Sequence, residues 1–187
     1  MAARAPVGVA GAPFLVGDRL MGGAAMPVGV VAAAATAAGA YLRIGAAPDT
    51  VLTQGAGTAL ALAEAFCGQT LIVRACEDVI GVARDWQRLS ALPVRAIAGP
   101  VGLPVGAYAV DIDAGGVGWV RVTAPGAATR VAVSYTAGLA VDWDALPEPV
   151  AQGVVLLAAH LFEHREGDTA PPAAVAALWR PYRRMRL

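Results

Sequence analysis

The hydrophobic spacing of this chain changes twice, and this change constrains the fold more than any single motif. Helical spacing predicts a first helix over Val28–Arg43 and a second from Asp49 or Thr50 to about Phe66, with Gly68 as its stop. From Thr70 to Tyr135 the apolar residues follow a period of two, and after Pro147 the helical period returns. Strands that are grouped between helices favour an α+β fold over a parallel, alternating α/β fold.

The middle third of the chain is predicted to form a small antiparallel sheet. Apolar and polar residues alternate strictly over Trp119–Val122 and Arg130–Tyr135, as expected for strands with one wet and one buried face. Turn-forming Gly, Pro and Asp residues separate the short runs. The other runs with strand character are Leu71–Val73, Val79–Val82, Val94–Ile97 and Tyr108–Ile112. We therefore expect a framework of about four helices, with a sheet over about 70–135 inserted between helices 2 and 3.

The carboxyl-terminal stretch Pro147–Leu187 is predicted to form two helices and a basic tail. Pro149 suits the first turn of the longer helix, and Gly167 is its expected stop. Pro171 and Pro172 precede a second helix over Ala173–Arg180, which Pro181 should end. Four of the last eight residues are Arg, although the formal net charge of the whole chain is +0. A neutral chain gives no electrostatic case for a nucleic-acid binder, so the charge of the tail is a local feature.

Length and composition set the expected domain organisation. A chain of 187 residues allows one domain with an insertion. Residues 1–27 are rich in Gly and Pro and lack periodicity, so we expect a flexible or extended arm there, followed by one domain over 28–180 and a tail over 181–187. No run qualifies as a signal peptide or a membrane span, which predicts a soluble, intracellular protein with no membrane partner. In that compartment Cys67 and Cys76 are expected to be buried thiols.

One string resembles a catalytic motif. His160-Leu161-Phe162-Glu163-His164 matches H-x-x-E-H, in which two His side chains one helical turn apart bind zinc and the Glu acts as a base. A zinc-dependent hydrolase is therefore the alternative function. Zinc also needs a third protein ligand, and only Glu166 and Asp168 follow His164 in the remaining chain. We therefore expect a helix with polar residues at its boundary, and no catalytic residue, metal or cofactor.

Two further groups of residues have a chemical and a structural interpretation. Asp111 and Asp113 flank Ile112 and could bind a cation, but solvated carboxylates are the simpler expectation. Trp86, near Arg84 and Arg88, could stack on a base, but an aromatic anchor beside solvated charges is the simpler expectation. No Walker A sequence, nucleophile elbow or dinucleotide fingerprint is present.

The order and spacing of four segments resemble the head–tail connector, or adaptor, family of long-tailed phages, and most closely the adaptors of gene transfer agents. The segments are Ala40–Ile44, Ala63–Ile72, Val133–Leu139 with Leu146–Pro147, and Leu156–Glu166 with Leu178–Arg183. The resemblance implies a structural, non-enzymatic protein that is assembled in the bacterial cytoplasm and incorporated into the neck of a phage-like particle. It implies a ring, typically of twelve copies, between the portal protein and the stopper, which extends the DNA channel and permits non-specific DNA contact in its lumen.

The same resemblance turns the basic tail into a predicted portal-docking element. Arg side chains bind carboxylates through two hydrogen bonds or stack on aromatic rings, and apolar side chains among them can fill a pocket. The residues predicted to dock are Trp179, Arg180, Tyr182, Arg183, Arg184, Met185, Arg186 and Leu187. Because Pro181 ends the preceding helix, we expect this tail to leave its own domain.

Overall fold

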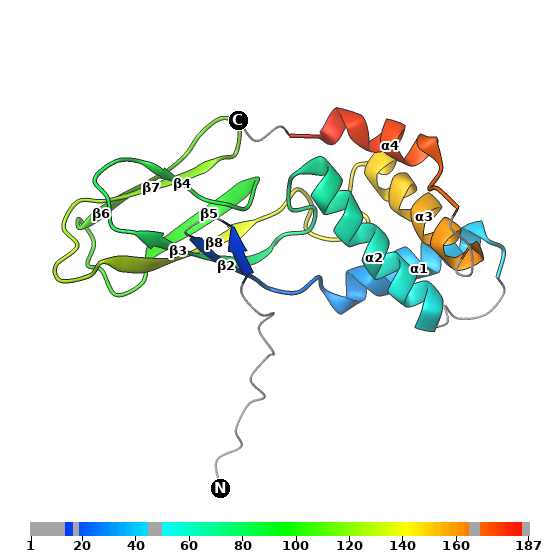
Figure 1. Cartoon of the computed structure of the whole chain (residues 1–187), viewed down its shortest axis with the longest axis horizontal. Coiled ribbons are helices and arrows are strands. Elements are labelled where there is room, and N and C mark those ends of the chain that lie inside the picture. Colours follow the sequence, from blue (N-terminus) through cyan, green and yellow to red (C-terminus); the bar gives the residue numbers. More distant parts are fainter. Residues whose placement is uncertain (1–13, 17–18, 45–49, 165–168, 185–187) are drawn as a thin grey trace, which may run out of the picture. The chain divides into compact units, whose positions relative to one another are not determined.

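A computed structural model describes residues 14–16, 19–44, 50–164 and 169–184 of the chain. Its contacts divide the chain into two compact units. The helical unit is built from 26–73, 91–93 and the chain after 136, and the strand unit from 74–90, 94–136 and the amino-terminal strands. Figure 1 shows all the helices in one unit and the sheets in the other. The predicted α+β class is thus confirmed.

Proline and glycine set the ends of the helices. The described helices are α1 (Val28–Tyr41), α2 (Thr50–Cys67), α3 (Glu148–Glu163) and α4 (Ala173–Trp179), with a 3₁₀ turn, η1 (Arg180–Tyr182), directly after α4. Pro27, Pro147 and Pro172 stand immediately before α1, α3 and α4, where a residue without an N–H costs the helix no bond. Gly68 follows α2 with a φ of 66°, a conformation that glycine adopts without strain.

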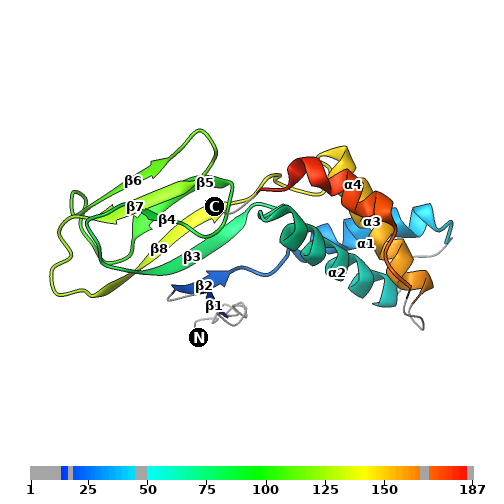
Figure 2. The same cartoon turned by 45° about the horizontal axis from the view of Figure 1, so that its top comes forward.

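Small side chains bring the first three helices close together. α1, α2 and α3 contact one another, and α4 packs on α3, as the turned view in Figure 2 also shows. Many of the fully buried positions of α1 and α2 are alanines, such as Ala34, Ala38, Ala59 and Ala63. The helical core therefore combines small alanines with larger side chains such as Leu52, Leu60 and Trp179.

The strand unit contains two sheets, whereas the sequence pattern predicted one. The described strands are β1 (Phe14–Val16), β2 (Arg19–Gly23), β3 (Arg74–Gly81), β4 (Gln87–Arg88), β5 (Val94–Pro100), β6 (Tyr108–Ile112), β7 (Gly118–Val122) and β8 (Arg130–Ala137). One sheet has the order β1-β2-β3-β8-β5 and the other β4-β7-β6. In the second sheet β7 pairs antiparallel with β4 and β6, with Val110 opposite Val120.

Several elements differ from the predicted ones. Leu71–Val73 was predicted as a strand, but among these residues only Ile72 takes part in pairing, through a single parallel bridge to Ala140. No strand was predicted within 1–27, where β2 pairs with β3 and β1 with β2. The Gly- and Pro-rich composition of this segment gives no strand pattern. β2 is extended because it pairs with β3, which lies far along the chain, and β1 is extended because it pairs with β2. The expected stop at Gly167 lies outside the described residues.

No helix in the described part of the chain is long and apolar enough to cross a membrane.

Candidate docking site at the carboxyl end of the helical unit

Trp179, the first residue predicted to dock, is part of the core of the helical unit. Its side chain is 3% exposed, and its indole N–H donates a 3.2 Å hydrogen bond to the Val150 carbonyl. A Cβ atom at Gly153 would collide with the indole, so this glycine makes room for the ring on α3. The Phe66 ring of α2 lies 5.8 Å from the Trp179 ring, centroid to centroid. Trp179 is therefore buried within its own chain, at the point where the tail begins.

Beyond Trp179, the described part of the tail returns to the end of α2. The Arg184 N–H donates to the Cys67 carbonyl at 2.8 Å, and the Gln69 side-chain amide donates to the Tyr182 carbonyl at 2.8 Å. A Cβ atom at Gly68 would lie 2.8 Å from the Arg184 carbonyl oxygen, so glycine is needed here for space as well as for its φ. These contacts use backbone atoms of the tail, so they do not depend on the chemistry of its side chains.

The arginine side chains of the described tail lie at the surface. Arg180, Arg183 and Arg184 are exposed, and Tyr182 is half-buried. The Arg183 guanidinium lies 5.8 Å from the centre of the Phe66 ring, within the range of a cation–π contact. Met185, Arg186 and Leu187 lie outside the described residues. The structure thus places Arg183 and Arg184 beside the end of α2 and leaves Arg180 exposed in the turn after α4.

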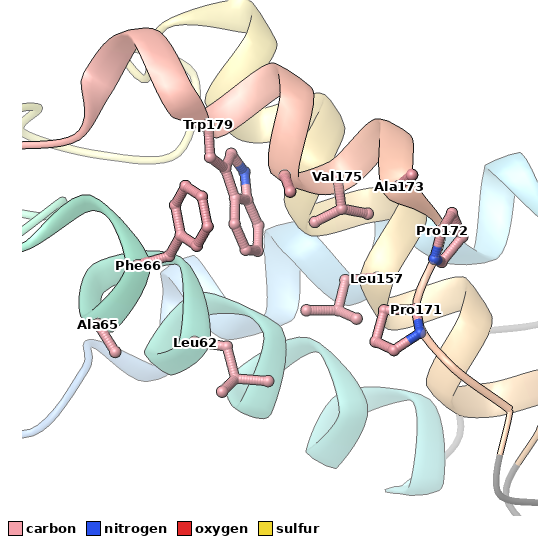
Figure 3. Close-up of a pocket in the computed structure, with 10 residues that line it drawn as sticks. Leu62, Ala65, Phe66, Leu157, Pro171, Pro172, Ala173, Val175 and Trp179 are labelled. Carbon is pink, nitrogen blue, oxygen red and sulfur yellow. The ribbon is translucent and has the colours of Figure 1, made fainter.

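An apolar pocket, which sequence reasoning missed, lies next to this tail. It has a volume of about 420 Å³ and opens between α2, α3 and α4. Figure 3 shows Leu62 and Leu157 between the aromatic pair Phe66 and Trp179 and the prolines Pro171 and Pro172. Its lining residues are Leu62, Ala65, Phe66, Leu157, Pro171, Pro172, Ala173, Val175, Ala176 and Trp179. A sequence signal did exist, since Leu62, Ala65 and Phe66 form a second apolar stripe on a helix whose other face is buried.

The H-x-x-E-H string lies at the end of α3, where its imidazoles bond to backbone carbonyls. His160 is 8% exposed and its Nε2 lies 3.0 Å from the Thr169 carbonyl oxygen, while His164 Nδ1 lies 3.1 Å from the His160 carbonyl oxygen. Because a carbonyl only accepts, each of these nitrogens is the protonated donor. The two rings stack with centroids 4.4 Å apart, and Glu163 is exposed. Among the described residues, no three His, Cys, Asp or Glu side chains are placed to hold a metal ion.

The carboxylate of Asp113 closes a turn. It accepts hydrogen bonds from the amides of Gly115 and Val117 and, at 3.1 Å, from the Trp119 indole. The Val117 amide first, and then the Trp119 indole, lower the pKa of the Asp113 carboxyl below its usual range. The group considered as a cation ligand is thus used to hold the β6–β7 hairpin.

The Trp86 ring is in contact with an arginine of β7. Trp86 is 42% exposed, and the Arg121 guanidinium lies 4.7 Å from its ring centre. Local spacing in the sequence did not indicate this partner from β7.

Cys67 and Cys76 are both buried, and neither takes part in a disulfide. Burial, with a smaller effect from Glu64, raises the pKa of the Cys67 thiol to about 11.

Asp78, which the sequence pattern did not single out, is the strand unit's buried acid. It is 1% exposed and accepts hydrogen bonds from the Ser90 amide at 2.7 Å and the Ser90 hydroxyl at 2.6 Å. The Ser90 hydroxyl also lies 3.1 Å from the Tyr135 hydroxyl. This arrangement stabilises the strand unit, because it satisfies a carboxylate that water cannot reach.

Comparison with known proteins identifies the family. No family model and no curated protein matches the sequence. Among solved structures, the chain is similar to one from the neck of an empty gene transfer agent particle, computed with C6 symmetry, at 28% identity and a TM-score of 0.70. That match covers 87% of this chain and 94% of the other.

Two further solved structures agree with the first. The chain is 29% identical to one from the neck of a native particle computed with C12 symmetry, with a TM-score of 0.68, 87% of this chain covered and 94% of that one. It is 30% identical to a chain from the virion of a native gene transfer agent particle, with a TM-score of 0.61 and coverage of 87% and 91%. Taken with the four sequence segments and the shared fold, this likeness along most of both chains shows that the protein belongs to the head–tail adaptor family of gene transfer agents.

Proposed function

We propose that this protein is the structural head–tail adaptor of a phage-like particle, and that its copies form a ring between the portal protein and the stopper. The observation that carries this proposal is the similarity to neck chains from particles computed with C6 and C12 symmetry. The ring extends the channel through which DNA passes, with twelve copies as the expected number. Such a channel needs no base-specific contact, since it must pass any sequence.

The exposed apolar side chains of the described residues support assembly. Val101 and Val105, which lie close together in one uncharged segment, are 61% and 96% exposed. Apolar surface of this kind is characteristic of a protomer whose neighbours cover part of it. The proposed role is structural rather than enzymatic. The similar solved chains are parts of particles, and the imidazoles of His160 and His164, which resembled zinc ligands, form hydrogen bonds with backbone carbonyls.

The tail is the proposed portal-docking element, with a revised division of work among its residues. Trp179 fixes the start of the tail in the helical core, and the exposed Arg180, Arg183 and Arg184 supply the charge for a partner. Met185, Arg186 and Leu187 are proposed to bind the same partner. The partner surface is expected to carry carboxylates, which guanidinium groups bind through paired hydrogen bonds.

The test is a triple charge reversal, R180E/R183E/R184E, in cells that produce the particles. The backbone atoms that clip the tail to Cys67 and Gln69 are unchanged, so the protomer should keep its circular dichroism spectrum and melting temperature. We expect heads that lack the adaptor and therefore lack tails, counted by electron microscopy. The matched control is R84E/R95E/R130E, which makes the same change of charge at exposed arginines of the strand unit and should leave tailed particles.

Tailed particles from the R180E/R183E/R184E variant would overturn docking by the tail. Contact with DNA phosphates is a different use of the same arginines. It predicts adaptors that still join the heads, with DNA retention that falls as the salt concentration rises.

A further inference from the structure

The loop between β5 and β6, Val101–Ala107, is a shaped apolar projection of the strand unit. It contains no charged residue, and Val101 and Val105 are 61% and 96% exposed. Gly102 and Gly106 take φ values of 81° and 96°, which turn the chain sharply at both ends of the tip. The loop therefore presents Val105 outward by its backbone conformation.

Hydrogen bonds at its base hold this loop in place. The Val101 N–H donates to the Ala132 carbonyl at 2.7 Å. At the other end, the Ala107 carbonyl accepts from the Thr123 and Ala124 amides at 2.8 and 3.0 Å. Because both ends are bonded to other segments of the strand unit, the apolar tip is already ordered before any partner binds, which lowers the entropy cost of docking.

The apolar pocket of the helical unit has complementary chemistry. Its rim includes Leu62, 46% exposed, and its walls include the buried Leu157 and Trp179. No lining residue is charged, and the one polar atom among the lining side chains, the Trp179 indole nitrogen, already donates to Val150. An occupant of this pocket therefore has to be apolar, because a buried polar group would find no partner there.

We infer that the β5–β6 loop of one copy docks, with Val105 first, into the α2–α4 pocket of the neighbouring copy. Projection and pocket are different surfaces of the same chain, so the contact is heterologous and repeats from copy to copy. Such a contact suits a protein whose relatives are found in necks computed with rotational symmetry, where every copy has an identical neighbour. The inference rests on the proposed ring and adds which surfaces form its subunit contact.

Cysteine cross-linking in assembled particles tests the pairing. The variants are V105C on the loop and L62C on the pocket rim, in a chain whose own cysteines are both buried. After mild oxidation, the double variant V105C/L62C should give a ladder of linked copies, since each copy joins two neighbours. Co-expressed single variants should stop at dimers, and neither single variant alone should link.

A charge in the loop gives the matching functional test. V105D should lower the fraction of particles that carry a complete adaptor ring at least tenfold, counted by electron microscopy, because the carboxylate would lose its water without gaining a partner. The control V141D places the same charge at another exposed valine and should associate like the wild type.

The outcomes separate this inference from the proposed function. Intact rings in the particles without a V105C–L62C link, or dimers formed by V105C alone, would overturn the loop-in-pocket contact and leave the adaptor role in place. Absence of any ring in the particles would overturn the proposed function, and the contact with it.

Discussion

At the residue scale, single glycines decide where large side chains can lie. Gly153 sits in the middle of α3, where glycine costs a helix about 0.5–1 kcal/mol relative to alanine. The structure explains why glycine is present despite this cost, since the Trp179 indole occupies the space that a side chain would fill. The position of α4 and of the tail therefore depends on Gly153 of α3, which has no side chain.

The substitution Gly153→Ala is expected to destabilise the protein by about 1–3 kcal/mol, because the indole must move from its place and its bond to Val150 is strained. Urea unfolding monitored by circular dichroism measures this. The matched control is Gly29→Ala in α1, where no atom lies within 4 Å of the added methyl group, and where the change should be neutral or stabilising by up to about 1 kcal/mol. Equal stability of Gly153→Ala and wild type would contradict the packing described.

Cys67 is expected to react slowly with thiol reagents in the folded protein. With a pKa of about 11 against 9.0 for an ordinary thiol, the thiolate fraction at pH 8 is roughly 100-fold lower, and burial adds to the protection. Reactivity should rise with pH toward 11. Because the raised pKa favours the neutral thiol, its contribution to stability is present below pH 9 and is lost as the pH rises through the folded value. Mass spectrometry of labelled peptides measures Cys67 alone, and rapid labelling at pH 8 without denaturant would disprove the assignment.

At the element scale, α1, α3 and α4 each begin directly after a proline, and a side chain closes the β6–β7 turn. Asp113 does this for the β6–β7 hairpin through two backbone amides and the Trp119 indole. The tail completes the end of α2, since the Arg184 N–H donates to the Cys67 carbonyl, and the Gln69 side-chain amide donates to the Tyr182 carbonyl just beyond it.

The Asp113 turn predicts a pH dependence with a definite sign. Its pKa lies below the ordinary aspartate value of about 3.9, so its contribution to stability is present above that value and is lost as the pH falls through the folded value. Unfolding followed from pH 7 to pH 2.5 should therefore show a steeper loss for the wild type than for Asp113→Asn. Asp111→Asn, an exposed neighbour on β6, serves as the control and should follow the wild type. Parallel curves for wild type and Asp113→Asn would count against this role.

At the scale of the whole molecule, the chain carries two units with separate tasks in the proposed ring. The helical unit holds the tail and the pocket, and the strand unit holds the projecting β5–β6 loop. When one chain carries both a projecting surface and the surface that binds it, its copies associate head to tail. They close into a ring when a whole number of the rotations between neighbouring copies makes one full turn.

Electron microscopy of the particle neck is expected to show this protein as a closed ring of twelve copies with head-to-tail contacts. The isolated protein need not form the ring, since the portal can act as its template, so the measurement belongs in assembled particles. A monomer, or a dimer related by a two-fold axis, at the neck would contradict the ring.

Much of the fold was predictable because the period of apolar residues is a local property. Tyr108–Ile112 was predicted with the bounds that β6 has, and all four helices were found within a few residues of their ends. The two residues of β4 and the strands β1 and β2 were missed, since their backbone is extended only because a partner strand pairs with it. The predicted strand Leu71–Val73 has only one bridge, because an apolar run becomes a strand only where a partner strand pairs along it.

The candidate site was predictable in composition but not in arrangement. The sequence alone determined the α+β class, the helix ends at proline and glycine, the arginine-rich tail and the resemblance to adaptors, because each depends on neighbours along the chain. Only the tertiary structure decided that Trp179 belongs to the core, that the tail returns to Cys67 and Gln69, and that α2, α3 and α4 enclose an apolar pocket. These features depend on which surfaces meet in space, and contacts between residues as distant as Gln69 and Tyr182 leave no periodic signal in the sequence.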